Sequence, residues 1–245
     1  MTHDSNIALL IDADNGSANK IEDVLDELAK YGVINIRRAY GNWKSTNLSG
    51  WESVLHEYAI QPIQQFAYSK GKNATDMALV IDAMDLLYTK HLEGVALVSS
   101  DSDFTPLVMR LRANGLKVYG FGEEKTPMPF VSACSRFLYL EKLGVPLPDA
   151  QPTNGKTAAP ARKTTKELKC DTRLMTLLRN AVASAADDSG WANLAAVGSH
   201  ISKQASFDQR NYGFAKLGDL FTEIDLFATE KRDKALYVRD TRKPA

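Results

Sequence analysis

The segment Val95-Ala96-Leu97-Val98-Ser99-Ser100-Asp101-Ser102-Asp103-Phe104 places two carboxylates just after an uninterrupted apolar run. Four apolar residues without alternation are typical of a strand that is buried on both faces, as in a parallel sheet. Ligands of open α/β sheets bind beyond the carboxyl ends of the strands, so Asp101 and Asp103 are expected to lie in a site. Two negative charges at this position predict that the bound ligand is a cation.

The start of the chain repeats this arrangement, because the apolar residues 7–11 run directly into Asp12-Ala13-Asp14-Asn15-Gly16. If both strands are central and parallel, Asp12 and Asp101 lie side by side at one edge of the sheet. Two carboxylates at such a short distance repel each other strongly unless a divalent cation or a proton neutralises part of their charge. Asp14 could belong to the same site, or it could be only a residue of the turn that follows the strand.

A further acid is expected from a long helix over residues 76–90. Its apolar positions fall in one arc at about 100° per residue and are predicted to form the buried face. These positions are Met77, Val80, Ile81, Met84, Leu87 and Tyr88. Asp76 borders the arc in the first turn, where it could reach the sheet edge, with Thr75 as the N-cap. Asp82 and Asp85 are expected to point toward solvent. The alternative for Asp76 is that acids favour the first turn of any helix through its dipole.

Strands and helices alternate along residues 1–145, which predicts an α/β fold with a mostly parallel sheet and helices on both faces. Further strands are expected at residues 35–40, 62–68, 117–122 and 136–140, and further helices at 17–31, 51–58 and 106–113.

A second domain is expected after a linker. Residues 146–169 are rich in Pro, Gly, Thr, Ala and Lys, which predicts a flexible connection. Residues 170–240 then show helical spacing in three segments, followed by two short strands that flank the charged turn 230–234. Three short helices and a hairpin describe a small winged-helix-like domain, a form that binds nucleic acid or protein.

The composition is ordinary for a soluble globular protein, with 44% hydrophobic and 24% charged residues over 245 residues. The net charge is zero, yet residues 1–145 carry 14 Lys and Arg against 18 Asp and Glu, and residues 146–245 carry 16 against 12. The basic second part could meet nucleic acid, although a solvated surface would show the same surplus. Two cysteines indicate neither a disulfide framework nor a zinc site. No membrane span or signal peptide is visible, so a cytoplasmic location is expected.

Four residues outside the acids are candidates for binding substrate, namely Asn15, Lys70, Lys72 and Trp43. Lys70 and Lys72 could neutralise a phosphate beside a metal ion, although they could equally be ordinary surface lysines. Trp43, with Tyr40, could form a stacking platform for unpaired bases, although such aromatics are often part of a core. Asp103 also has an alternative role, as the N-cap of the helix that begins near Pro106.

Three acidic segments together resemble the NYN domain family, a branch of the PIN-like nucleases, over about residues 6–143. These segments are Ile11-Asp12-Ala13-Asp14-Asn15, the loop at residues 72–76, and Ser99-Ser100-Asp101-Ser102-Asp103-Phe104. The last part of the chain is similar to a LOTUS domain, also called OST-HTH. The residues that carry this second resemblance are Trp191, Tyr212-Gly213-Phe214 and Lys216-Leu217-Gly218-Asp219-Leu220-Phe221.

The resemblance implies a metal-dependent ribonuclease that cleaves RNA phosphodiester bonds with carboxylates at the carboxyl ends of the strands. Asp12, Asp76 and Asp101 match the acidic positions of the family as catalytic and metal-binding residues, Asp103 would be a fourth, and Asn15 would support the first. The residue types fit this chemistry independently, because Mg²⁺ and Mn²⁺ prefer oxygen ligands and turn a bound water into a nucleophile. The expected partner is RNA, single-stranded or unpaired, and the C-terminal domain could bind RNA or a protein.

Two other functions remain open. Asp12-Ala13-Asp14 copies the paired acids of haloacid dehalogenase-like phosphohydrolases, but that family has Thr or Val where this chain has Gly16, and its catalytic lysine has no clear counterpart here. A non-catalytic RNA-binding or assembly protein on a nuclease fold is the other alternative. Against it, carboxylates clustered without a metal would cost stability.

Overall fold

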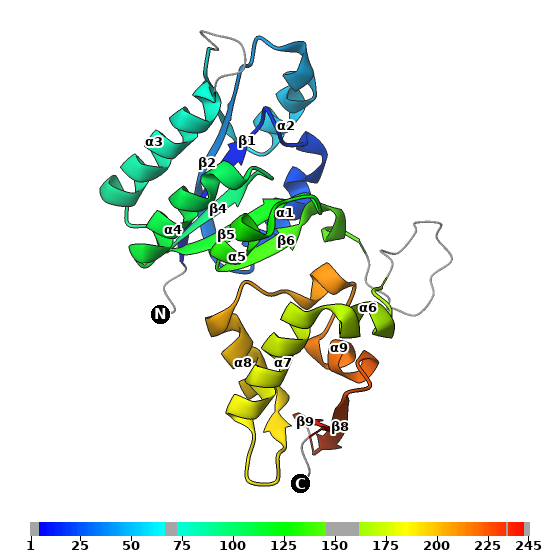
Figure 1. Ribbon diagram of the computed structural model, residues 1–245. Coiled ribbons are helices and arrows are strands. Elements are labelled where there is room, and N and C mark those ends of the chain that lie inside the picture. The colour runs from blue at the N-terminus through cyan, green and yellow to red at the C-terminus, as the bar shows by residue number, and fades with distance from the viewer. Residues whose placement is uncertain (1–4, 67–72, 146–161, 234, 243–245) are drawn as a thin grey trace. The chain divides into compact units, whose positions relative to one another are not determined.

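The computed structural model describes residues 5–66, 73–145, 162–233 and 235–242. The chain folds as two compact units, Met1–Gly144 and Val145–Ala245 (Figure 1). Each unit encloses its own hydrophobic core, and each is described by itself.

The first unit is built on a six-stranded parallel sheet with the spatial order β3-β2-β1-β4-β5-β6. The strands are β1 (Asn6–Asp12), β2 (Val33–Gly41), β3 (Gln61–Gln64), β4 (Gly94–Val98), β5 (Lys117–Gly122) and β6 (Arg136–Tyr139). The chain moves outward in one direction from β1 to β3 and then returns to the centre at β4, so the order reverses between β1 and β4. Such a switch point leaves a crevice at the carboxyl ends of the two strands.

Five helices connect these strands, with short 3-10 turns between them. The helices are α1 (Ile21–Leu28), α2 (Glu52–Glu57), α3 (Ala74–Thr89), α4 (Thr105–Ala113) and α5 (Met128–Ala133). The 3-10 turns are η1 (Ala18–Lys20), η2 (Thr46–Trp51), η3 (Ser102–Phe104) and η4 (Leu140–Lys142).

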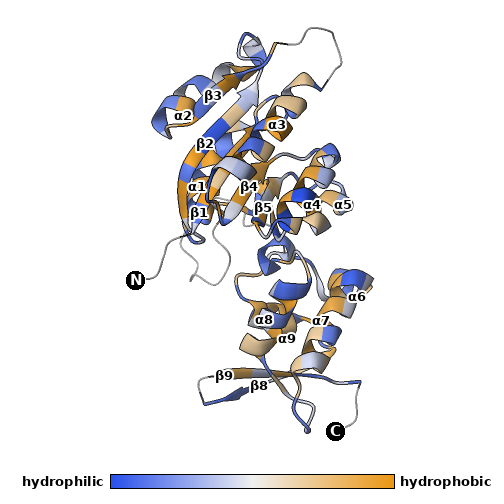
Figure 2. Ribbon diagram, turned by 90° about the vertical axis from the view of Figure 1, so that its left-hand side faces the viewer, coloured by the Kyte–Doolittle hydropathy of each residue, from blue (hydrophilic) through white to orange (hydrophobic). Residues whose placement is uncertain are grey.

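The sheet is buried on both faces, because alternate residues of each strand point to opposite layers. In β1, Ile7, Leu9 and Ile11 belong to the core that includes residues of α1 and α2. Ala8 and Leu10 belong to the core that includes residues of α3, α4 and α5. Figure 2 shows hydrophobic colour on the central strands between these layers. The α/β prediction, with a mostly parallel sheet and helices on both faces, is confirmed.

Helix α3 turns a different side to the sheet from the one that the sequence predicted. Its buried residues are Leu79, Ala83 and Leu86. Of the predicted apolar arc, Met77, Ile81 and Tyr88 are 59%, 58% and 62% exposed. The other three, Val80, Met84 and Leu87, are partly buried against the core, so the prediction was correct for half of the arc. It was wrong for the rest because α3 carries apolar residues around most of its circumference, and periodicity alone does not select a side.

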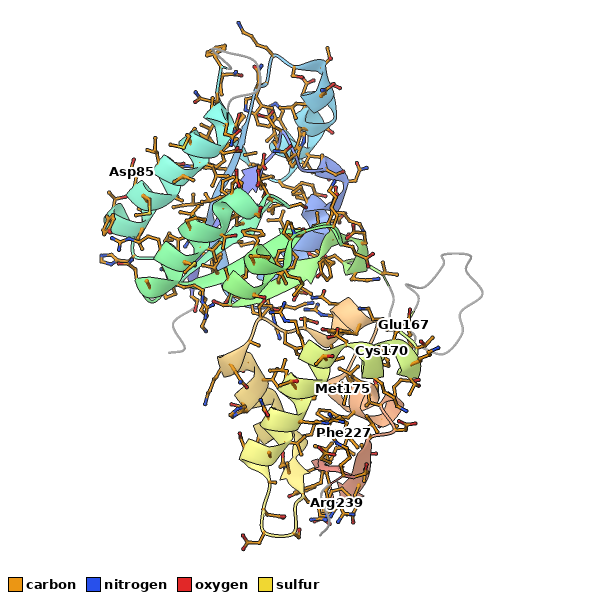
Figure 3. All side chains as sticks on the ribbon, viewed as in Figure 1. Asp85, Glu167, Cys170, Met175, Phe227 and Arg239 are labelled. Atoms are coloured by element: carbon orange, nitrogen blue, oxygen red, sulfur yellow. The ribbon has the colours of Figure 1, made fainter. Side chains whose placement is uncertain are left out.

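The two later acids of α3 consequently differ in their surroundings. Asp85 is exposed and lies on the outward side of the helix, as expected (Figure 3). Asp82 was also expected in solvent, but its carboxylate accepts hydrogen bonds from Arg38 and from the Tyr40 hydroxyl of β2. Tyr40 is 0% exposed, so it belongs to the core and offers no stacking platform.

The second unit has a helical core and a small antiparallel sheet. Its helices are α6 (Thr165–Cys170), α7 (Thr172–Ala185), α8 (Leu194–Gln204) and α9 (Leu217–Glu223), with the 3-10 turn η5 (Gln209–Tyr212). The sheet has the order β7-β9-β8, from β7 (Ala192–Asn193), β8 (Phe227–Arg232) and β9 (Ala235–Asp240). Met175 and Phe227, labelled in Figure 3, lie in its core. The predicted three helices and hairpin are present.

Helix α6 begins inside the segment that was expected to be linker. Thr164 and Glu167 form a capping box, in which the Thr164 N–H donates to Glu167 Oε2 at 2.8 Å and the Glu167 N–H donates to Thr164 Oγ1 at 3.4 Å. Leu168 is 0% exposed and anchors the helix in the core. Residues 165–169 are therefore helical, and residues 146–161 lie outside the described part of the chain.

No helix within the described residues is both long enough and apolar enough to cross a membrane. The cysteines are both free thiols, with Cys134 buried in the first unit and Cys170 exposed in the second.

Candidate active site

Asp12 is the last residue of β1 and lies at the switch point of the sheet. Its carboxylate is 1% exposed, and Oδ2 accepts hydrogen bonds from Asn15 Nδ2 at 3.1 Å and from Ser99 Oγ at 3.0 Å. Burial raises the pKa of Asp12, while these two hydrogen bonds favour the charged form and act in the opposite direction. Gly16 allows the tight turn that follows, since a Cβ there would lie 2.7 Å from the backbone oxygen of Asp12.

Ser99 joins the two acidic segments, a role that the sequence analysis missed. It follows β4 and is 3% exposed. Its hydroxyl donates to Asp12 and accepts from the Asp101 N–H at 3.0 Å. The parallel register that pairs Ile11 with Val98 brings Asp12 and Ser99 together. The only sequence signal for this role was a small polar residue directly after a buried strand.

Asp101 is the N-cap of η3, because its Oδ1 accepts from the Asp103 N–H at 2.8 Å. The capping role that was considered for Asp103 is not observed, because the N-cap of α4 is Phe104, without a side-chain capping bond. Asp103 is itself exposed, so its side chain stands at the mouth of the site.

Asp14 connects three segments of the same edge. Its carboxylate accepts from the Asn42 N–H after β2 at 3.1 Å and from Thr75 Oγ1 in α3 at 2.7 Å. Asp14 is therefore more than a turn residue. Thr75 is not the N-cap of α3, since Asn73 occupies that position without a side-chain capping bond.

Asp76, in the first turn of α3, is the acid most perturbed by the others. Its pKa is raised to about 6, first by burial and then by the negative charges of four other carboxylates. These are Asp12, Asp101, Asp14 and Asp103, in decreasing order of effect. The fold thus gathers acids from the ends of β1 and β4 and from the start of α3 into one electrostatic unit.

The chemistry of these donors fits a hard divalent cation, because every candidate ligand is an oxygen. Within the described residues, however, no three His, Cys, Asp or Glu side chains converge closely enough to hold one ion. Several of the carboxylates are instead turned toward local donors such as Asn15, Ser99 and Thr75. Mg²⁺ commonly keeps several waters and uses only one or two protein carboxylates, so a sparse donor set is compatible with it.

The predicted substrate-binding residues separate in the structure. Asn15 contacts Asp12, as described above, which makes it a positioning residue in this conformation. Trp43 is half-buried against the core, and its indole N–H donates to the Ile63 oxygen at 3.0 Å. It lines a pocket between η2, α2 and β3 that contains none of the acids. Lys70 and Lys72 lie outside the described residues.

An open parallel sheet with acids at its central switch point has the architecture of a nuclease-type α/β domain. The chain belongs to the NYN domain family, whose model matches residues 6–141, and this family lies within the PIN-like nuclease superfamily. An OST-HTH/LOTUS domain, an RNA-binding type, follows at residues 168–238. Both resemblances noted in the sequence are confirmed.

Individual relatives add little about function. The uncharacterized protein MJ0482 of Methanocaldococcus jannaschii is 30% identical over 123 residues, which are 48% of each chain, so the match spans about half the length of that relative. A crystal structure of VPA0982, a protein of unknown function from Vibrio parahaemolyticus, is 18% identical and covers 57% of this chain and 94% of its own, with a TM-score of 0.47. A solution structure of an uncharacterized protein from Nitrosomonas europaea is 31% identical, and the match covers 40% of this chain and 90% of that protein's chain, with a TM-score of 0.28. These scores are too low to support a functional argument.

Proposed function

We propose that the first unit is a metal-dependent ribonuclease and that its catalytic residues are Asp12, Asp76, Asp101 and Asp103. One observation carries the proposal, namely that the fold gathers carboxylates from the ends of β1 and β4 and from the first turn of α3. Burial and four neighbouring carboxylates accordingly raise the pKa of Asp76 to about 6. Strongly perturbed carboxylates in a crevice are typical of functional sites. Their mutual repulsion is the electrostatic condition that a divalent cation relieves.

In this proposal Asp12, Asp76 and Asp101 would hold Mg²⁺ or Mn²⁺, directly or through bound waters, with Asp103 as a further ligand at the mouth of the site. The ion would activate a water and neutralise charge on the leaving oxygen of the phosphodiester. Asn15 and Ser99 fix the orientation of the Asp12 carboxylate by donating to it. Asp76 must lose its proton before it can ligate, so the affinity of the site for the metal ion should increase as pH rises through about 6.

The OST-HTH domain would supply binding to the RNA strand. Part of its basic surplus is neutralised internally, since Arg210 pairs with Asp208 and Lys169 pairs with Asp225. Trp191 is half-buried, and two arginines lie over its ring. The guanidinium carbon of Arg232 is 5.0 Å from the ring centre and that of Arg239 is 4.8 Å from it. Cationic and aromatic groups gathered in this way suit unpaired RNA, which binds by stacking and by phosphate contacts. A protein partner for this domain is the competing proposal.

A non-catalytic RNA-binding protein is the second candidate function. It is favoured by one observation, that no three acids of the described residues converge on a common point. The phosphohydrolase alternative is weakened at Gly16, because the Thr or Val of that family would bring a Cβ to 2.7 Å from the Asp12 oxygen.

The test is cleavage of an end-labelled, unstructured RNA by the full chain in Mg²⁺, in Mn²⁺ and in EDTA. Asp12→Asn is the informative variant, and Asp85→Asn is its control because Asp85 is exposed on the outward side of α3. We expect metal-dependent products from the wild type and from Asp85→Asn, and none from Asp12→Asn. RNA binding without cleavage in all three proteins would favour the non-catalytic candidate.

A further inference from the structure

A pocket of about 650 Å³ lies directly beside the acids, between the start of α3, the η3–α4 junction and α5. Asp76 and Asp103 belong to both the acidic site and the wall of this pocket. Whatever occupies the pocket therefore contacts the same carboxylates that the proposed ribonuclease reaction uses.

The rest of the wall is largely apolar. Its apolar residues are Met77 and Val80 of α3, Phe104 and Pro106, and Pro129 of α5, and the polar residues Ser102 and Thr105 also line it. Met77 is 59% exposed, so its side chain is accessible to a ligand in the pocket. Methionine is flexible and polarizable, and it packs well against flat aromatic groups.

A small number of polar groups accompany this apolar wall. Asn73 lines the pocket, and its side chain does not cap α3 although it stands at the N-cap position. An amide offers both a donor and an acceptor, which matches the edge of a nucleobase. A pocket with apolar walls and a few polar groups is typical of small-molecule sites, and its volume is in the range that holds a nucleotide.

We propose that this pocket receives the nucleobase next to the phosphate that lies at the acids. The proposal rests on the ribonuclease function proposed above and adds a substrate requirement to it. A base can enter a side pocket only if it is unstacked and unpaired. The site would therefore select RNA that is single-stranded at this position, and it would do so through apolar contact with little dependence on base identity.

Binding can be tested without cleavage by following methionine methyl signals in the full chain labelled with ¹³C-methyl methionine. Adenosine and uridine are the probes because they are uncharged and need no metal ion, and ribose is the control for the sugar. Millimolar nucleoside should shift the Met77 signal, and ribose should not. Met109, 62% exposed on α4 and outside the pocket, serves as the internal control and should not move. A Met77 signal that is unmoved by both nucleosides, or that moves no more than Met109, would overturn the proposal.

Kinetics on RNA provides the second measurement, with a matched pair of variants. Met77→Glu places a charge in the pocket, whereas Ile81→Glu places the same charge one turn along α3, on a residue of nearly equal exposure, 58%. Met77→Glu should raise KM by about 5- to 100-fold with little change in kcat, because one base contact is lost. Ile81→Glu should leave both constants unchanged. Equal effects of the two substitutions would contradict the assignment of the pocket.

An RNA with a single abasic residue beside the cut site ties the effect to the base. On this substrate the KM of the wild type should rise by a similar factor. The KM of Met77→Glu, which is already raised on normal RNA, should rise little further. Additive losses would show that Met77 and the base act independently, and would overturn the proposal. A nucleoside-dependent Met77 shift in a protein that cleaves nothing would support the pocket while removing the proposed function. Cleavage by a protein whose Met77 signal does not respond to nucleoside would support the proposed function and overturn the pocket proposal.

Discussion

Replacing Asp76 with Asn should stabilise the metal-free protein at high pH and have little effect at low pH. The pKa of Asp76 is about 6 in the folded state, against an ordinary value of 3.8. Between these two values the folded state binds more protons than the unfolded state, so the free energy of unfolding falls as pH rises through this window. Above pH 6 the folded protein carries the full cost of a charged Asp76, and the neutral amide removes it.

The expected magnitude follows from the shift. About two pKa units correspond to at most about 3 kcal/mol at pH 8, and because Asp76 is only partly buried, solvent screening reduces this to about 1–2 kcal/mol. The same relation leaves less than about 0.5 kcal/mol at pH 4. The expected gain for Asp76→Asn is therefore about 1–2 kcal/mol at pH 8 and close to zero at pH 4.

Urea unfolding in EDTA measures this difference. A Trp191→Phe background leaves Trp43 and Trp51 as reporters of the first unit, since the chain has three tryptophans. Asp85→Asn, on the exposed side of the same helix, is the control and should change the free energy of unfolding little at either pH. A gain for Asp76→Asn that is the same at pH 4 and pH 8, or that Asp85→Asn matches, would refute the electrostatic coupling of Asp76 to the other acids.

Three further predictions concern the support of the site. Ser99→Ala breaks the link between Asp12 and the Asp101 backbone, so it should lower the free energy of unfolding by about 1–3 kcal/mol and slow cleavage. An unchanged single-turnover rate in that variant would mean that Ser99 does not position the acids. Tyr40→Phe removes a hydrogen bond to the Asp82 carboxylate and should cost about 1.5–3 kcal/mol in urea unfolding without altering the cleavage rate, whereas a large rate loss would place the Tyr40 contact in the mechanism. A chain ending at residue 145 should bind long RNA more weakly in a filter-binding assay but cleave a saturating short RNA at nearly the full rate; loss of that rate would argue against a delivery role for the OST-HTH domain.

The positions of the central acids could be predicted because they depend on a local pattern with a strict geometric consequence. An apolar run that ends in Asp12 or precedes Asp101 marks the carboxyl end of a buried parallel strand. The sheet pairs β1 with β4, so the two acids come to the same edge although 89 positions separate them in the chain. Strand order itself needed the rule that ligand sites lie at switch points.

The orientation of α3 could not be predicted in the same way. Apolar residues occupy most sides of this helix, and the sheet selected Leu79, Ala83 and Leu86 where the sequence pattern favoured Met77 and its neighbours. Packing against a specific partner decides between such faces, and the periodicity of the helix alone does not reveal that partner. The same limit applies to Ser99, whose role depends on the alignment of two strands distant in the chain.

The most direct test of the central claim is the single-turnover cleavage rate of an unstructured RNA, measured against Mn²⁺ concentration for wild type, Asp101→Asn and Asp85→Asn. Asn can still cap η3, so Asp101→Asn removes the charge while preserving the local fold. The account predicts saturable Mn²⁺ activation in wild type and Asp85→Asn, and a rate at least about 100-fold lower in Asp101→Asn, as expected when several kcal/mol of charge stabilisation are lost. Equal rates in wild type and Asp101→Asn, or cleavage that is independent of Mn²⁺ and survives EDTA, would contradict it.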